Sequence, residues 1–313
     1  MKLRLLSLSI PIFVSVLLVA QQPAPQRTSP SDPQQPAKPP VALPIEAPDP
    51  VDEFVCPMDP DVHSLTPGKC PRCGMTLVAG VPDFVEYPVT LKTEPRAVKP
   101  GVPFEFQISV TNPKDGKRVT DFEIMHEKIF HFFAVSQDLS YFIHEHPVKG
   151  EDSVFRLPGT LPKPGLYRML SDFYPKGGTP QLIAKTLVVP GAPFNTRNSK
   201  LKADTGTQQG ANVDVSLSME PAEPIAGMKT LMFFKLSDAE GFEPYLGAWG
   251  HMLTASEDLI DMIHNHPFIA DGGPNVQFNM IFPRPGIYRV WVQFQRKGVV
   301  NTVAFNVPVS ELK

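Results

Sequence analysis

The sequence predicts a mainly β protein in which a small, loop-rich, metal-stabilised module precedes two tandem immunoglobulin-like β-sandwich repeats. The 37 prolines and 21 glycines among 313 residues favour short strands and turns over helices. The chain also repeats itself, because residues 129–147 (IFHFFAVSQDLSYFIHEHP) align without a gap with residues 249–267 (WGHMLTASEDLIDMIHNHP). LPKPGLYRM and FPRPGIYRV follow at nearly the same distance in each copy, so we expect two copies of one domain.

The first 20 residues are typical of a signal peptide. Lys2 and Arg4 precede an apolar run that ends at Ala20, near which we expect cleavage. The alternative is a retained membrane helix, but the run is short for a bilayer and contains Pro11. No cysteine follows the apolar core, so we expect no lipid anchor and no membrane attachment after cleavage. The predicted location is therefore periplasmic or secreted.

A tether and a linker separate the predicted folded parts. Residues 21–50 alternate Pro, Gln, Ala and Ser, and contain almost no large apolar side chain. Such a segment cannot bury enough apolar surface to offset the entropy of ordering, so we expect it to be disordered. The cysteine-containing module follows at residues 51–82. We place the two sandwich repeats at residues 84–192 and 211–313, joined by a polar linker at residues 193–210.

Each repeat shows the patterns of short strands between turns. In the first repeat, residues 104–110 (FEFQISV) alternate apolar and polar side chains, which predicts a strand with one face buried. Tyr167 and Tyr288 each stand two residues after a Pro-Gly turn and open an apolar strand. They resemble the corner tyrosine of immunoglobulin-like sandwiches, whose hydroxyl bonds nearby backbone, so we expect a structural role for both.

The cysteines predict a metal site. Cys70 and Cys73 form a CxxC pair followed at once by Gly74, and Cys56 supplies a third thiol. In such a knuckle two sulfurs converge on one ion, and glycine suits the positive φ of the turn behind them. A disulfide with one spare thiol fits an odd cysteine count badly. A redox pair needs its first cysteine at a helix N-terminus, whereas Cys70 follows a Pro-Gly turn.

The identity of the fourth ligand is open at this point. A zinc ribbon would have a second CxxC, but Asp59 stands where its second cysteine would be. The candidates are the Asp59 carboxylate, the His63 imidazole, and the thioethers of Met58 and Met75. Carboxylate or imidazole beside three thiolates suits zinc, whereas thioethers favour copper(I) or silver(I).

The segment resembles a small heavy-metal-binding domain found in copper/silver efflux adaptors and copper-transporting P-type ATPases. That family reads approximately CPMHP, a short spacer and PGKCPxCGMxL, and this chain has CPMDP and PGKCPRCGMTL. The resemblance covers about residues 54–80 only, and it implies binding of one soft metal ion. The family's histidine after CPM is replaced by Asp59, which makes His63 a candidate for the nitrogen ligand.

The remaining histidines fall at equivalent positions of the two copies. His131, His144 and His146 align with the second-copy residues His251, His264 and His266. A hairpin centred between Gln137 and Asp138 would set His131 directly opposite His144, with His146 diagonal on the same face.

The same construction in the second copy, centred between Glu257 and Asp258, sets His251 opposite His264. Each repeat would then carry a three-imidazole patch suited to copper or zinc, to which His126 could add a ligand in the first copy. The alternative is that these histidines are packed or surface residues kept by duplication, because apolar Ile129, Phe133 and Val135 share the face of His131.

These features favour a metal-binding protein over an enzyme. The net charge is −3 with a pI near 6.2, and no basic patch indicates nucleic-acid binding. No nucleophile context or cofactor loop indicates catalysis. We therefore expect an exported protein that binds copper(I), silver(I) or zinc and acts in envelope metal handling or resistance. Its expected protein partner is a metal efflux or envelope protein. The alternative is a tandem β-sandwich interaction protein of the envelope in which the cysteine module is only a structural zinc clip.

Overall fold

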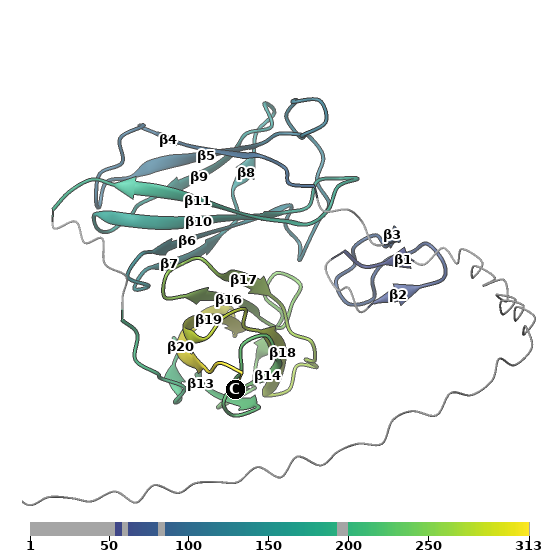
Figure 1. Cartoon of the computed structure of the whole chain (residues 1–313), viewed down its shortest axis with the longest axis vertical. Coiled ribbons are helices and arrows are strands. Elements are labelled where there is room, and N and C mark those ends of the chain that lie inside the picture. The colour runs from purple at the N-terminus through teal and green to yellow at the C-terminus, as the bar shows by residue number, and fades with distance from the viewer. Residues whose placement is uncertain (1–53, 58–61, 81–84, 193–199, 313) are drawn as a thin grey trace, which may run out of the picture. The chain divides into compact units, whose positions relative to one another are not determined.

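The computed structural model describes residues 54–57, 62–80, 85–192 and 200–312 (Figure 1). These residues form strands and no helix, so the prediction of a mainly β protein is confirmed. None of them forms a helix long and apolar enough to cross a membrane. The predicted signal peptide, the predicted tether, and Met58 and Asp59 lie outside the described residues.

The cysteine-containing module has a three-stranded antiparallel sheet. Its strands are β1 (Phe54–Val55), β2 (His63–Ser64) and β3 (Val78–Ala79), in the order β2-β1-β3. The buried side chains at its centre are Cys56, Cys70 and Leu77, with Phe54, Val62 and Cys73 packed against them. Two of the three buried residues in this cluster are cysteines, and Val55 and Met75 are the other buried apolar side chains among the described residues of the module, so it has little apolar core of its own.

The first repeat is a sandwich of two antiparallel sheets. One sheet has the order β4-β5-β9-β8, formed by β4 (Val89–Glu94), β5 (Phe104–Val110), β9 (Phe155–Gly159) and β8 (Val148–Lys149). The other has the order β11-β10-β6-β7, formed by β11 (Gln181–Val189), β10 (Gly165–Phe173), β6 (Phe130–Ser136) and β7 (Phe142–Glu145). Alternate residues of β5 are buried, as its sequence predicts.

The second repeat has the same two-sheet construction. One sheet has the order β12-β13-β14-β18, formed by β12 (Gln208–Gln209), β13 (Asp214–Glu220), β14 (Lys229–Leu236) and β18 (Asn275–Ile281). The other has the order β15-β19-β16-β17, with β20 also paired to β19, and is formed by β15 (Phe242–Glu243), β19 (Gly286–Arg296), β16 (His251–Ser256), β17 (Met262–Asn265) and β20 (Val299–Val309).

Each sandwich has its own apolar core, and a third apolar layer joins the two sandwiches. The layer contains Phe133 and Leu170 from the first repeat and Leu253 and Trp291 from the second. Trp291 stacks on Phe142 across the boundary, with ring centroids 5.0 Å apart and planes 11° apart. Both faces of β6 and β16 are consequently buried, one face inside its own sandwich and the other against the neighbouring repeat.

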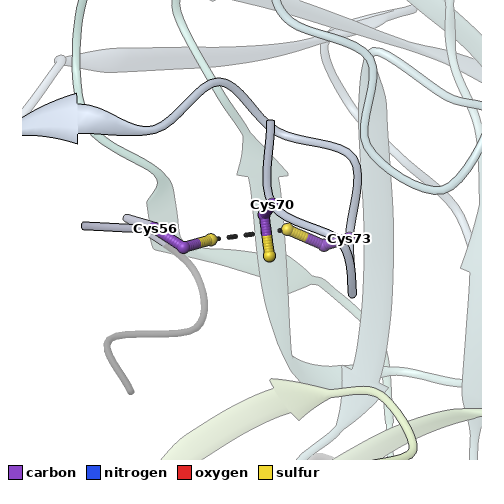
Figure 2. A group of neighbouring side chains, drawn as sticks. All are labelled: Cys56, Cys70 and Cys73. Carbon is purple, nitrogen blue, oxygen red and sulfur yellow. Dashed lines mark hydrogen bonds between the residues drawn. The ribbon is translucent and has the colours of Figure 1, made fainter. Parts of the chain in front are cut away.

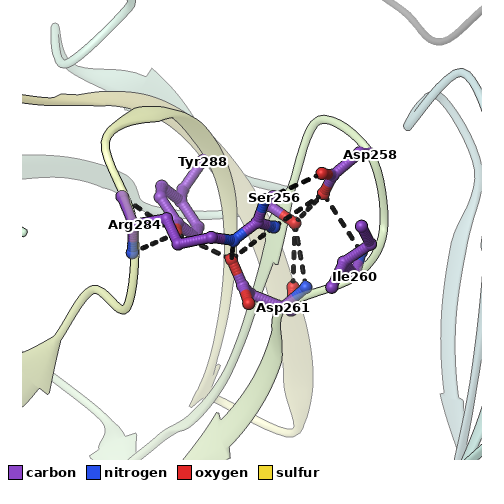
Figure 3. Close-up of polar contacts among 6 residues, drawn as sticks. All are labelled: Ser256, Asp258, Ile260, Asp261, Arg284 and Tyr288. Carbon is purple, nitrogen blue, oxygen red and sulfur yellow. Dashed lines mark hydrogen bonds and ion pairs between the residues drawn. The ribbon is translucent and has the colours of Figure 1, made fainter.

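The corner tyrosines lie where the sequence predicts. The Tyr167 hydroxyl donates a hydrogen bond to the Lys163 carbonyl at 2.9 Å, and the Tyr288 hydroxyl donates one to the Arg284 carbonyl at 3.0 Å. In the second repeat, Arg284 also pairs with Asp258 and Asp261 in the β16–β17 hairpin loop (Figure 3). The corner and the hairpin loop therefore brace each other.

The hairpin loops are centred one residue later than predicted. In the first repeat the Leu139 N–H donates to the Ser136 carbonyl, and the Ser136 N–H donates to the Tyr141 carbonyl. Leu139 has a φ of 57°, and the Asp138 carboxylate accepts a hydrogen bond from the Ser136 hydroxyl at 2.6 Å. The second repeat repeats this loop, with Leu259 at a φ of 56°. In both repeats, a leucine in the left-handed backbone region and an aspartate that accepts a hydrogen bond from the loop serine together set the register of the hairpin.

The apolar layer between the repeats can be tested through Trp291. Trp291→Ala should lower the free energy of unfolding by about 3–5 kcal/mol, because a large side chain would leave a closed layer. Ile281→Ala is the control, since Ile281 is 55% exposed, and its effect should stay within about 0.5 kcal/mol. Urea denaturation followed by circular dichroism measures both. A loss below about 1 kcal/mol for Trp291→Ala would show that the layer is not packed in solution.

Candidate metal centres

The backbone of the knuckle positions Cys70 and Cys73. The Cys70 N–H donates to the Met75 carbonyl at 2.7 Å, and the Gly74 N–H donates to the Cys70 carbonyl at 2.9 Å. Gly74 has a φ of 76°, which glycine adopts without strain and which the CxxCG pattern predicts. Cys56 follows β1 directly, and its N–H donates to the Val62 carbonyl at 3.0 Å. Two separate segments thereby bring the three thiols to one place.

The three sulfur atoms form a compact group, which we call the thiolate cluster (Figure 2). All three Sγ atoms lie within 4.8 Å of one another, and those of Cys56 and Cys73 are 3.5 Å apart. The three cysteines form no disulfide in this structure, which contradicts the disulfide alternative. Thiolates held about 2.3 Å from one ion at tetrahedral angles stand roughly 3.8 Å apart, so the cluster has the size of a metal site.

Burial affects the chemistry of the cluster. Cys56 and Cys70 are buried and Cys73 is half-buried. Burial raises the pKa of the Cys70 thiol, because a thiolate is poorly solvated there. Without an ion the thiol therefore keeps its proton at neutral pH. A bound cation would displace that proton and offset the negative charge of the sulfur.

Two of the four predicted fourth ligands lie within the described residues. His63 is exposed on β2, opposite Val55 of β1, and is not among the donor atoms that gather at the thiolate cluster. Met75 is buried and packs with Met125, Tyr174 and the half-buried Cys73. The structure thus brings together Cys56, Cys70 and Cys73, and places Met75 beside them.

The histidines of the two repeats gather in one place instead of forming two separate patches. The predicted register is wrong by two residues, because Phe133 pairs with His144 and Leu253 pairs with His264. A shift of two keeps each side chain on its predicted face, so the histidines of one copy still lie together. That face is the one that packs against the other repeat. We call the resulting group, formed by His126, His131, His144, His146, His251, His264 and His266, the histidine cluster.

Within the histidine cluster, ring nitrogens approach to hydrogen-bonding distance. His131 Nδ1 lies 3.0 Å from His144 Nε2 and 3.1 Å from His146 Nε2. Donor atoms of His144, His251 and His264, which come from both repeats, lie within 4.8 Å of one another. His126 lies against His266 of the second repeat, with ring centroids 3.6 Å apart, instead of completing a first-repeat patch.

Burial keeps most of these imidazoles neutral. It lowers the pKa of His131 to about 4 and the pKa of His146 to about 3, and neighbouring histidines add to the effect. Burial also lowers the pKa values of His144, His251 and His266 well below the usual 6.5. Neutral imidazole is the form that binds a metal ion.

A cavity of about 740 Å³ reaches both groups of donors. Its lining includes Cys73 of the thiolate cluster and His264 and His266 of the histidine cluster. It also includes Asp172, which contacts His264. Residues of both clusters therefore border one cavity that is large enough to admit hydrated ions.

Sequence reasoning missed Asp172 and Gln293, which contact the histidine cluster. The Asp172 carboxylate bonds His264, and the Gln293 side-chain amide bonds His144. A signal was present, because each is a polar residue within an apolar strand, five positions after its corner tyrosine.

Comparisons with known proteins agree with this division of the chain. A family model described as a domain of unknown function (DUF8832) matches residues 83–190 and again residues 207–311, together more than half of the chain. A model described as a heavy metal binding domain matches residues 54–79, which confirms the resemblance drawn from the cysteine motif. No curated protein matches the chain.

Three solved structures illustrate the distant similarity. Red sea bream transglutaminase is 10% identical, with a TM-score of 0.22, and the match covers 73% of this chain but only 32% of that one. The fibronectin(III)-like modules of Clostridium thermocellum CbhA are 10% identical, with a TM-score of 0.20 and coverage of 72% and 95%. Domains 4 and 5 of the S-layer protein SbsC are 11% identical, with a TM-score of 0.21 and coverage of 73% and 100%.

The buried neutral histidines predict acid-sensitive folding of the metal-free protein. An unfolded histidine takes up a proton near pH 6.5, whereas folded His131 resists protonation until about pH 4. Below pH 6.5 the unfolded state therefore binds more protons than the folded state. The free energy of unfolding is highest above that pH and falls as the pH drops towards 4. Each unit of pKa difference corresponds to about 1.4 kcal/mol. Titration of His131 alone should therefore lower the free energy of unfolding by roughly 2–3 kcal/mol at pH 4.

Urea denaturation of chelator-treated protein at several pH values between 7.5 and 4.5 measures this loss. His131→Gln should flatten the pH profile, because glutamine does not titrate. Equal pH profiles for the parent and the variant would contradict the assignment of His131 as a buried neutral group.

Proposed function

We propose that this chain, which belongs to the family of the domain of unknown function (DUF8832), is an exported, non-enzymatic heavy-metal-binding protein. One soft ion binds at the thiolate cluster of Cys56, Cys70 and Cys73. The observation that carries the proposal is the convergence of all three thiols within 4.8 Å, in a segment that matches a heavy metal binding domain. The apolar run at residues 5–20 supports export, and hence a role in envelope metal handling or resistance.

The donor set favours copper(I), silver(I) or zinc as the ion. Thiolates are soft, strongly donating ligands, and all three metals bind them well. The buried thioether of Met75 beside the half-buried Cys73 supports a monovalent soft ion. An oxygen or nitrogen ligand from Asp59 or His63 would instead support zinc. A metal efflux or envelope protein is the partner that fits such an ion carrier.

The second candidate function is a structural zinc clip in a β-sandwich interaction protein. The observation that favours it is the small core of the module, whose central cluster of buried residues contains Cys56, Cys70 and Leu77. A segment of this size gains its folding free energy largely from the ion. The rate of metal exchange separates the two functions, because an ion carrier releases its ion to a competing chelator and a clip retains it.

Removing two thiols should abolish binding at the thiolate cluster. Full-length Cys70→Ser/Cys73→Ser protein should lose the soft ion, because a serine hydroxyl does not replace a thiolate as a ligand. Leu65→Ser in the same module is the control, since Leu65 is 72% exposed. Native mass spectrometry with copper(I), silver(I) and zinc measures stoichiometry and competition. Unchanged uptake at this centre by the double variant would refute the ligand assignment.

Substitutions at Asp59 and His63 identify the fourth ligand. If Asp59 occupies the position of the family's histidine, Asp59→His should raise the affinity for zinc, because imidazole suits that ion. His63→Ala should then leave the affinity unchanged. Competition titrations with a chromophoric zinc chelator measure both variants. Weaker binding by His63→Ala together with normal binding by Asp59→Ala would reverse the two roles.

A further inference from the structure

Hydrogen bonds to backbone fix the tautomers of one histidine in each repeat. His131 Nε2 lies 3.1 Å from the Met125 carbonyl, and His251 Nε2 lies 2.8 Å from the Tyr245 carbonyl. A carbonyl can only accept, so both Nε2 atoms carry the proton. In a neutral imidazole the other nitrogen then has a free lone pair. The Nδ1 atoms of His131 and His251 are therefore lone-pair donors that face the histidine cluster.

Side-chain acceptors orient a second pair of histidines, and each acceptor comes from the opposite repeat. His144 Nδ1 donates to Gln293 Oε1 at 2.8 Å, and His264 Nδ1 donates to Asp172 Oδ2 at 2.5 Å. Asp172 pairs with His131 in its own sheet, and Gln293 pairs with His251 in the other, so the two acceptors are equivalent in the repeats. Each repeat thus supplies the acceptor for a histidine of the other repeat, so neither repeat alone fixes the orientation of its own histidine.

These tautomers place lone pairs face to face. His131 Nδ1 and His144 Nε2 are both unprotonated in the neutral rings, yet they lie 3.0 Å apart. A proton on His146 Nε2 can satisfy His131 Nδ1, but it leaves His144 Nε2 without a donor from His131. His264 Nε2 is buried and has no hydrogen-bond partner among the described residues. Buried lone pairs that converge with too few donors are explained by an ion or a water among them, and imidazole lone pairs are metal ligands.

We propose that the two repeats jointly form a second metal centre, in which imidazoles from both repeats bind one zinc or copper(II) ion. Its candidate ligands are His131, His144, His146, His251 and His264. The three-residue groups that meet within 4.8 Å share His144, and one lone pair binds one ion, so the expected stoichiometry is one ion per chain. This inference does not depend on the thiolate cluster.

The chemistry of the surroundings suits such an ion. Nitrogen ligands about 2.0–2.1 Å from zinc at tetrahedral angles stand roughly 3.3 Å apart. The 3.0 and 3.1 Å separations around His131 Nδ1 come within a few tenths of an ångström of that spacing. A carboxylate that accepts from the outer nitrogen of a ligating histidine, as Asp172 does for His264, orients the ring and raises its basicity. The cavity that His264 lines supplies a route of entry.

The test uses untagged, full-length protein that carries Cys56→Ser, Cys70→Ser and Cys73→Ser, so that only nitrogen and oxygen donors remain. The metal-free protein is dialysed against Zn²⁺ or Cu²⁺, and bound metal is counted by elemental analysis and native mass spectrometry. We expect one ion per chain. The electron paramagnetic resonance spectrum of the Cu²⁺ form should show hyperfine coupling to at least three nitrogens, a readout that needs no histidine variant.

Histidine variants in the same background test whether the centre is shared. His144→Ala and His264→Ala come from different repeats, and each should remove the single ion. Leu65→Ser is the control, because Leu65 is 72% exposed and lies outside both clusters, and it should bind like the parent. Asp172→Asn should weaken binding about 10- to 100-fold, since the ring loses its carboxylate acceptor. Circular dichroism confirms that each variant is folded.

Two results would overturn the proposal. One is failure of the cysteine-free protein to take up either ion at micromolar concentration. The other is retention of the ion by folded His264→Ala protein while His144→Ala loses it, since the site would then belong to one repeat. Neither result bears on the thiolate cluster, whose ion is measured separately in protein with intact cysteines and His144→Ala.

Discussion

The packing of one sandwich against the other is the constraint on which most of this structure depends. The faces of β6 and β16 that point away from their own cores meet in an apolar layer that includes Phe133, Leu253 and Trp291. This contact removes water from both strands, and it carries His131 and His251 into the interior with them. Their neutral state follows from that burial, whereas hydrogen bonds to the Met125 and Tyr245 carbonyls fix their tautomers. The protonation of the histidine cluster is therefore a consequence of how the repeats pack.

The two groups of donor atoms differ in how they relate to folding. In the cysteine-containing module two of the ligands lie in the central buried cluster, so an ion there would act as a part of the fold. The sandwiches have large cores of their own, and their strands and acceptors hold the imidazoles in place before any ion arrives. The first group therefore gains order from its ion, whereas the second is already ordered and loses little conformational entropy on binding.

The sequence is informative about local features and uninformative about the contact between repeats. The left-handed Gly74, the corner hydroxyls of Tyr167 and Tyr288, and the faces of the histidines all follow from spacing and turn chemistry. The hairpin register does not, because a leucine at positive φ gives no turn signal comparable to that of glycine or asparagine. The meeting of His144 with His264 depends on which sheet faces cover each other. The available clue was the apolar run of β6, which only His131 interrupts before Ser136. Such a run is typical of a strand covered on both sides, and β6 is buried throughout.

The exchange of acceptors between Asp172 and Gln293 has the form of an isologous dimer interface contained within one polypeptide. In a symmetric dimer both acceptors would be the same residue, so the interface would hold two carboxylates or two amides. Joining the copies in tandem removes that restriction. Here one half has a carboxyl group at this position and the other has an amide, so the two halves of the interface differ chemically. The tandem chain therefore has a pseudo-two-fold interface whose two ends are chemically distinguishable.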